Sequence, residues 1–373
     1  MIKFANIHLF QPLPATHWIF VTIGDDAGHI GLGECSFSGL TPEVIASARK
    51  IAAQLVGVGQ HHALTKLSSN GATGSVAAAA QAGINQALCD LGARRAGRSV
   101  ASQLGHPVRG ELSFYANINR GIADRSPNGF ALAAQSAMAA NVQAVKIAPF
   151  DAITPATCAD GSARDLISLG LDRIAAVRET LGAIPLMVDC HWRFDVETAR
   201  NVIRQVAEFG IEWFECPIPE TEKNLNHLRT LRSEANHRGM KLAGGERVWA
   251  LDQVQAFLKR EAYDVIMPDV KYTQSLSTFI AMGRTIQEAG TQFSPHNPTG
   301  PIAHAMTMEV CSLFENTELI EYQHGETPQF DKIVSHGLPP IISGSANLDP
   351  ARKGLGLSLN LPTDIRSDLV AAR

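Results

Sequence analysis

The chain has 373 residues, of which 45% are hydrophobic and 18% are charged. This composition is typical of a globular protein with a substantial core, and the length suits a barrel of about 250 residues plus a further module. The formal net charge of −4 is spread along the chain, which argues against a nucleic acid or an anionic membrane as partner. No apolar run approaches the roughly 18 residues of a membrane helix, and residues 1–4 lead into a strand pattern rather than a signal peptide.

The six cysteines show no C-x-x-C spacing, and most of them lie in apolar runs. Their pattern indicates reduced, packed thiols, as in cytosolic proteins. They are Cys35, Cys89, Cys158, Cys190, Cys216 and Cys311. We therefore expect a cytoplasmic protein, and we expect it to form a homo-oligomer.

The N-terminal third begins as sheet and continues as helix. Residues 2–9, 18–23 and 30–34 are strand-like, and helical patterns follow at 42–55 and 75–95. The glycines between positions 28 and 33 suggest a dinucleotide-binding loop. They lie in a predicted hairpin with no helix after it, so we reject this interpretation. Residues 1–110 thus predict an α+β capping domain.

Short apolar runs alternate with amphipathic helical stretches over residues 111–336. The runs cover residues 113–117, 144–148, 186–190, 212–215, 242–245, 265–268, 292–295 and 319–322. Eight strands at intervals of 23 to 42 residues predict an α/β fold, a (β/α)8-like modified TIM barrel, rather than an open doubly wound sheet. Residues 337–373 lack a further repeat, and we expect this C-terminal segment to return to the cap.

Three acidic residues close consecutive predicted strands: Asp189, Glu215 and Glu246. Any one of them could be a helix cap or a surface acid. Their spacings of 26 and 31 residues equal one strand plus one helix, which places all three at the same rim of a barrel. Hard oxygen ligands in this arrangement suit Mg²⁺.

Further polar residues end the other predicted strands. Asp269 and His296 are 27 residues apart on consecutive strands, so the carboxylate can orient the imidazole as a general base. Lys146 is a candidate to hold a substrate carboxylate or to act as a second base. Glu321 is a candidate to hydrogen-bond the substrate carboxylate in its protonated form.

These residues and their contexts resemble the enolase superfamily, in particular its mandelate-racemase-like branch and the galactonate dehydratase type of acid-sugar dehydratase. The resemblance spans nearly the whole chain. It includes the hairpin at 18–35, the helix Ala-Gly-Ile-Asn-Gln-Ala-Leu-Cys-Asp-Leu at 82–91, the loop Pro-His-Asn-Pro-Thr-Gly-Pro-Ile at 295–302 and the segment Lys-Gly-Leu-Gly-Leu at 353–357.

The resemblance implies Asp189, Glu215 and Glu246 as Mg²⁺ ligands and Asp269–His296 as the base dyad. It also implies that His191, two residues after the first ligand, is the acid that protonates a leaving hydroxyl. The expected activity is Mg²⁺-dependent dehydration of an acid sugar, an aldonate such as galactonate or an aldarate, through a metal-stabilised enediolate to a 2-keto-3-deoxy acid.

The chain also departs from the family pattern. Ala144 replaces a lysine of racemases, as in galactonate-type dehydratases; Cys216 replaces the second glutamate of Glu-Glu-Pro; Gln274-Ser275 replace Gly-Gly; and the loop at 68–74 is short. The last three of these changes fall near the pocket, so the identity of the substrate stays open. A racemase or epimerase using Lys146 and His296, a sugar-lactone cycloisomerase and a catalytically silent sugar-acid-binding protein remain alternatives.

The cap is expected to close over the distal end of the substrate through residues 12–20 and 68–74. His17, Trp18 and Asn117 are the candidate contacts with the acid sugar.

Overall fold

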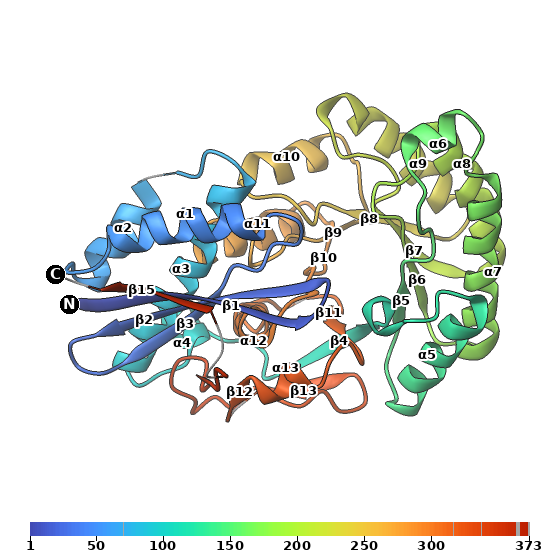
Figure 1. Cartoon of the computed structure of the whole chain (residues 1–373). Helices are drawn as coiled ribbons and strands as arrows, with labels where there is room; N and C mark the ends of the chain where they lie inside the picture. The colour runs from blue at the N-terminus through green and yellow to red at the C-terminus, as the bar shows by residue number, and fades with distance from the viewer. Residues whose placement is uncertain (70, 316, 337, 363–365, 372–373) are drawn as a thin grey trace.

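The computed structural model of this protein describes residues 1–69, 71–315, 317–336, 338–362 and 366–371. It consists of a sheet-and-helix cap beside a barrel of strands enclosed by helices (Figure 1). Among the described residues, no helix is both long and apolar enough to cross a membrane.

The cap is a four-stranded antiparallel sheet in the order β15-β1-β2-β3, packed against helices. Its strands are β1 (Ile2–Leu13), β2 (Thr16–Asp25), β3 (Ile30–Glu34) and β15 (Arg366–Ala371), and its helices are α1 (Thr41–Ala53), α2 (Gln60–Ser69), α3 (Ser75–Arg95) and α4 (Val100–Leu104). Both ends of the chain therefore meet in one sheet, because the last strand pairs with the first.

The glycines of β3 serve helix packing. A Cβ on Gly31 would lie 2.0 Å from the Ala87 carbonyl oxygen, and one on Gly33 would lie 1.9 Å from the Gly83 carbonyl oxygen, both in α3. The strand can approach this helix so closely only without side chains. The glycine pattern is thus explained by packing, and the rejection of a dinucleotide loop agrees with the hairpin that β2 and β3 form.

Eight parallel strands form the barrel wall in the order β10-β9-β8-β7-β6-β5-β4-β11. They are β4 (Glu111–Asn117), β5 (Val145–Ile147), β6 (Leu186–Asp189), β7 (Ile211–Glu215), β8 (Lys241–Gly244), β9 (Val265–Ile266), β10 (Gln292–Phe293) and β11 (Ile320–Gln323). The wall closes between β10 and β11, where the Glu318 amide donates to the Phe293 carbonyl at 3.0 Å. The predicted barrel with its cap is confirmed, and each predicted run overlaps a strand.

Two of the barrel strands that are shorter than the sequence predicts end before prolines. β9 and β10 each keep two residues in the ladder and end before Pro268 and Pro295. Proline has no N–H to donate, so the ladder cannot continue through it. Asp269 and His296 directly follow these two prolines, so both lie beyond the ladder at the rim of the barrel.

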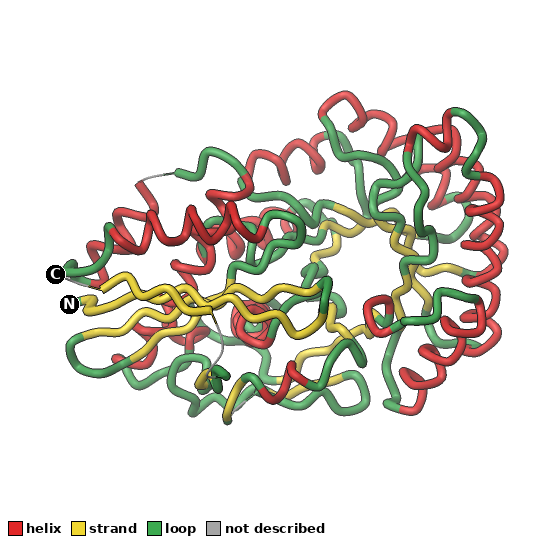
Figure 2. The backbone as a smooth tube through the Cα atoms, in the orientation of Figure 1, coloured by secondary structure: helices red, strands yellow, loops and turns green. Residues whose placement is uncertain are grey.

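Helices surround the wall of strands (Figure 2). They are α5 (Pro127–Ala139), α6 (Pro155–Ala159), α7 (Arg164–Leu181), α8 (Val196–Val206), α9 (Leu225–Asn236), α10 (Leu251–Lys259), α11 (Leu276–Glu288) and α12 (Pro301–Cys311). In α8, Asp195 caps the first turn by accepting from the Thr198 amide at 2.7 Å, and Val202, Ile203 and Val206 are buried. Because its apolar residues lie on one face, the helix packs that face against the sheet.

The C-terminal segment contacts the barrel before it reaches the cap. Its elements are β13 (Ser345–Asn347), β14 (Ser358–Leu359) and then β15, whereas α13 (Gln329–Lys332) and β12 (Val334–Ser335) precede it at the end of the predicted barrel region. β13 pairs antiparallel with the start of β4, and only β15 joins the cap sheet. The barrel interior itself is filled by side chains such as Tyr115, Met187 and Trp213, so it is a packed core with its polar groups at one end.

Candidate functional site

The carboxylates predicted as metal ligands lie at the C-terminal ends of neighbouring strands. Asp189 ends β6 and Glu215 ends β7, and the two are direct partners in the parallel ladder. Glu246 follows β8 after Gly245, whose φ of 85° is a left-handed conformation that favours glycine. All three carboxylates are buried.

Lys146 lies between two of the acids. Its Nζ donates to both carboxylate oxygens of Glu215, at 2.9 and 3.0 Å, and forms an ion pair with Glu321 at 3.1 Å. Lys146 is 1% exposed and packs over the Tyr115 ring. Burial alone lowers the pKa of Lys146, but Glu215 and Glu321 raise it well above its usual range. The lysine is therefore a fixed cation that holds two acids in place.

Glu321 is surrounded by donors. Besides Lys146, the Asn117 side-chain amide donates to Oε1 at 2.7 Å and the Asn297 backbone amide donates to Oε2 at 3.1 Å. Burial alone raises the pKa of Glu321, but Lys146, His296 and these donors lower it to about 2. The expectation of a protonated Glu321 is wrong in this structure, because all of these partners favour the carboxylate.

Asp189 is held by the histidine that follows it. His191 Nε2 lies 3.0 Å from Asp189 Oδ2, and the His191 amide donates to Oδ1 at 2.9 Å. The Asp189 carboxylate raises the pKa of His191, against the opposing effect of burial. His191 and Trp192 have φ values of 48° and 57°, a region that non-glycine residues rarely adopt and that is often found at functional sites.

The donor atoms that converge are not the three that the sequence predicts. Among the described residues, Glu215, Cys216 and Glu246 place one donor atom each within 4.8 Å of one another. Asp189 is turned toward His191 instead. Oε2 of Glu246 is buried and accepts no hydrogen bond; His296 Nε2 lies 3.3 Å from it.

The site carries an excess of buried negative charge. Five carboxylates and two ammonium groups are buried together, which leaves three uncompensated negative charges when the imidazoles are neutral. The acids are Asp189, Glu215, Glu246, Asp269 and Glu321, and the ammonium groups are Lys146 and Lys271. Burial and the neighbouring acids raise the pKa of Glu215 well above its usual range, despite Lys146. A divalent cation fits this donor set, because it would offset two of these charges and satisfy Glu246.

The Asp269–His296 pair lies where the sequence predicts it, with an additional partner. Asp269 Oδ2 accepts from His296 Nδ1 at 2.8 Å. The same oxygen pairs with the Lys271 ammonium, and the Lys271 amide donates to Oδ1 at 2.8 Å. A proton on Nδ1 leaves Nε2 as the basic nitrogen.

These groups face a cavity of about 570 Å³ between the barrel and the cap. Asp189, His191, Glu246, His296 and Glu321 line it, whereas Lys146 and Asp269 lie behind them. The predicted substrate contacts His17, Trp18 and Asn117 also line the cavity.

The two cap segments that were expected to cover the substrate, residues 12–20 and 68–74, differ in whether they line the cavity. The turn between β1 and β2 borders the cavity through residues 13–18. No described residue of 68–74 does; the Ala72 amide donates instead to Gln274 on the barrel at 3.1 Å. The expectation that both segments cover the site is therefore met only by the hairpin.

The cavity residues that sequence reasoning missed include Arg120, Arg247 and Tyr272. Arg247 directly follows Glu246, so its position was the available signal. Arg120 and Tyr272 lie in loops after β4 and β9, where no residue pattern marked them.

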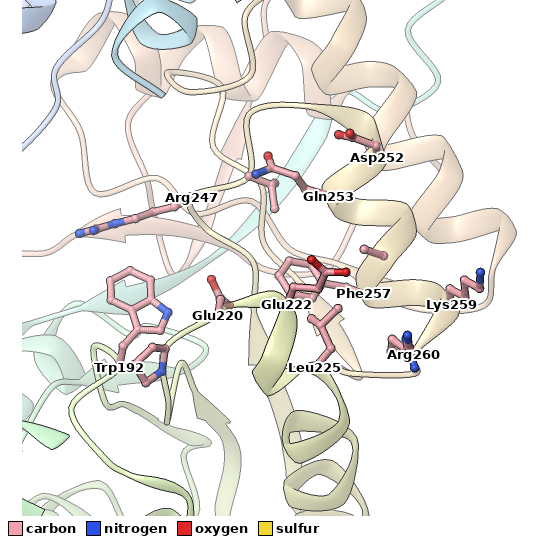
Figure 3. A pocket seen from close by; sticks show the side chains of 13 residues that line it. Trp192, Glu220, Glu222, Leu225, Arg247, Asp252, Gln253, Phe257, Lys259 and Arg260 are labelled. Atoms are coloured by element: carbon pink, nitrogen blue, oxygen red, sulfur yellow. The ribbon is translucent and has the colours of Figure 1, made fainter. Parts of the chain in front are cut away.

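A second cavity of about 720 Å³ adjoins the first beyond Trp192 and Arg247. The Arg247 guanidinium lies 4.3 Å above the Trp192 ring and points away from Gln253, Asp252 and Lys259 (Figure 3). Glu220 also lines this cavity, and its Oε1 accepts from the Gly245 amide at 2.6 Å.

Comparison with known families matches both parts of the chain. Residues 11–105 match the mandelate racemase/muconate lactonizing enzyme N-terminal domain, and residues 130–363 match the enolase C-terminal domain-like family.

Similar proteins include acid-sugar dehydratases. The chain is 23% identical to D-xylonate dehydratase of Haloferax volcanii, over 92% of this chain and 84% of that protein. It is 24% identical to D-galactonate dehydratase of Xanthomonas campestris pv. campestris, over 93% of this chain and 90% of that protein. The crystal structure of an enolase superfamily member from Salmonella Typhimurium superposes with a TM-score of 0.84 at 20% identity, covering 99% of this chain and 100% of the other, which shows a shared fold.

Proposed function

Because the chain belongs to the mandelate racemase/muconate lactonizing enzyme family of the enolase superfamily, we propose that it is a Mg²⁺-dependent acid-sugar dehydratase. It would convert an acid sugar to a 2-keto-3-deoxy acid. The relatives named D-xylonate and D-galactonate dehydratase support this reaction class.

The observation that carries the proposal is the placement of two histidines. His191 follows β6 and His296 follows β10, four strands away around the barrel, and both line the same cavity. A dehydration needs one group to take the α-proton and another to protonate the leaving hydroxyl. Two imidazoles on opposite sides of one cavity can divide these tasks.

In the proposed reaction His296 Nε2 accepts the α-proton, with Asp269 holding the ring through Nδ1. The C–O bond at the β-carbon then breaks, and its oxygen takes a proton from His191 and leaves as water. The resulting enol of the substrate tautomerises to the 2-keto acid. Each proton transfer of this kind is worth about 10²- to 10⁴-fold in rate.

Glu215, Glu246 and Asp189 would hold the divalent ion, with Asp189 released from His191. When bound, the ion withdraws electrons from the substrate carboxylate and so makes the α-proton more acidic. Lys146 holds the carboxyl groups of Glu215 and Glu321 in place.

The placement of Lys146 favours dehydration over racemisation. A two-base racemase requires a second base facing the substrate, yet Lys146 is sealed from the cavity between two carboxylates. This contact pattern supports Lys146 as a positioning cation rather than a base.

Incubation with a library of aldonates and aldarates in the presence of Mg²⁺ tests the proposal. Formation of a 2-keto-3-deoxy acid from at least one member, and its loss with a chelator, is the expected result. A library in which substrates only epimerise or cyclise would assign the chain to another reaction of the family.

A further inference from the structure

We propose that Cys216 is a sulfur ligand of this metal centre, and that its thiolate raises the affinity of the centre for borderline first-row ions such as Mn²⁺ or Co²⁺ relative to Mg²⁺. The inference deepens the proposed function, since it concerns the ion that the same site would hold. It starts from the Cys216 thiol, which lies beside one oxygen each of Glu215 and Glu246.

The thiol already lies within reach of the carboxylates. Sγ of Cys216 and one oxygen each of Glu215 and Glu246 are mutually within 4.8 Å. Opposite ligands of a single ion lie about 4 to 4.5 Å apart, given metal–sulfur and metal–oxygen bonds of about 2.3 and 2.1 Å. A small inward movement of these side chains would thus place all three on one ion.

A second observation points independently to a cation at this position. Glu246 is 5% exposed, and its Oε2 is buried without a hydrogen bond from any described residue, with His296 Nε2 3.3 Å away. A buried carboxylate oxygen without a donor is costly, and a metal ion removes that cost.

The backbone fixes Cys216 across the strand ends. Its amide donates to the Ala243 carbonyl of β8 at 3.0 Å, and its carbonyl accepts from the Trp192 amide at 2.6 Å. Its φ of 47° is left-handed, and Pro217 follows directly. A residue held in a strained conformation by β8 and by the loop after β6 is well suited to present a ligand.

Glu220 provides a route for the thiol proton. A thiol binds a metal ion as thiolate, so the S–H bond breaks and the proton must leave as the metal–sulfur bond forms. Cys216 Sγ donates to Glu220 Oε1 at 3.9 Å, and the Tyr263 hydroxyl fixes that oxygen at 2.7 Å. Glu220 lines the second cavity, so the proton can pass from its carboxylate to solvent (Figure 3).

The sulfur ligand changes which ion the site selects. Mg²⁺ is a hard ion that prefers oxygen, whereas thiolate favours softer divalent ions. The ratio of Co²⁺ to Mg²⁺ affinity should therefore depend on the side chain at position 216. A residue that only packs against the site would not change this ratio, so the ratio shows whether Cys216 is a ligand.

Titration of the metal-free full-length protein with Co²⁺ tests the inference without using turnover. The wild type should develop a near-ultraviolet sulfur-to-cobalt charge-transfer band that saturates at one equivalent. Cys216→Ser should lose the band, and calorimetry should show Co²⁺ affinity weakened about tenfold or more with Mg²⁺ affinity within about twofold.

Cys190→Ser is the matched control, because Cys190 is also buried and directly follows a predicted ligand; it should keep the band. Cys216→Ala serves if the serine variant does not fold. Three results would overturn the inference. The band could persist in the Cys216 variants, the wild type could bind Co²⁺ without the band, or the Cys216 variants could lose affinity for Co²⁺ and Mg²⁺ equally. Absence of acid-sugar turnover would overturn only the proposed function, whereas a wild type that binds neither ion would overturn both.

Discussion

His191 and His296 stand on opposite sides of one cavity, four strands apart around the barrel, and each contacts a different carboxylate. His191 Nε2 lies 3.0 Å from Asp189, and His296 Nδ1 lies 2.8 Å from Asp269. This arrangement separates the expected acid from the expected base, and substitutions should separate their effects.

His296→Asn should abolish both α-hydrogen exchange with D₂O and dehydration, because no base remains for the first step. His191→Asn should retain exchange while dehydration falls by about 10²- to 10⁴-fold. Proton NMR of an acid-sugar substrate in D₂O measures both rates. His227→Asn, on the exposed face of α9, is the control. Equal loss of exchange in the two variants would contradict separate roles.

Lys271 should act by positioning Asp269. Its ammonium shares Asp269 Oδ2 with His296, so Lys271→Met removes the group that balances the carboxylate and fixes its direction. We expect kcat to fall by about 10- to 100-fold with KM changed little, as for other residues that orient a catalytic ligand. Lys271→Arg should restore part of the activity. A change confined to KM would indicate a direct substrate contact instead.

The buried His304 should make the fold sensitive to acid. Burial lowers the pKa of His304 from 6.5 to about 4, and its Nδ1 accepts a hydrogen bond from the Asn297 side chain at 2.9 Å. The unfolded state therefore binds a proton between pH 6.5 and about 4 that the folded state excludes, so stability falls as the pH falls through this window.

The loss attributable to His304 should be about 3 kcal/mol in the free energy of unfolding across that window. Denaturant unfolding at pH 7 and pH 4 measures it. His304→Gln keeps a hydrogen-bond acceptor but cannot titrate, and it should show a smaller loss than the wild type. Identical losses in the two proteins would exclude His304 as a source of the acid sensitivity.

Gly33→Ala should destabilise the cap, because the added Cβ would meet the Gly83 carbonyl of α3 at 1.9 Å. Overpacking of this kind costs about 1 to 3 kcal/mol. Gly59→Ala, where a Cβ meets nothing within 4 Å, is the matched control for thermal unfolding. An unchanged melting temperature in Gly33→Ala would show that β3 and α3 can separate without cost.

The sequence predicted the barrel because its periodicity is a local property. Each predicted run overlaps a strand, and in two of the runs that are too long the strand ends before Pro268 or Pro295. The same reasoning placed Asp189, Glu215, Glu246, Asp269 and His296 at one rim, because parallel strands bring their C-terminal ends together.

What the sequence could not predict depends on side-chain direction and on contacts between distant segments. Lys146 pairs with Glu215 and Glu321, which follow it by 69 and 175 residues, so its burial between them is visible only in the fold. Cys216 lies beside a carboxylate of the next strand for the same reason. The ionised state of Glu321 likewise follows from donors that no local pattern reveals.

Turnover of an acid sugar in D₂O, with and without a chelator, is the most direct test of dehydration at this metal centre. The proposed mechanism predicts a 2-keto-3-deoxy acid with one solvent deuterium at C3, formed only when a divalent ion is present. Product formation that is insensitive to the chelator, or substrate recovered with deuterium at C2 and no loss of water, would contradict it.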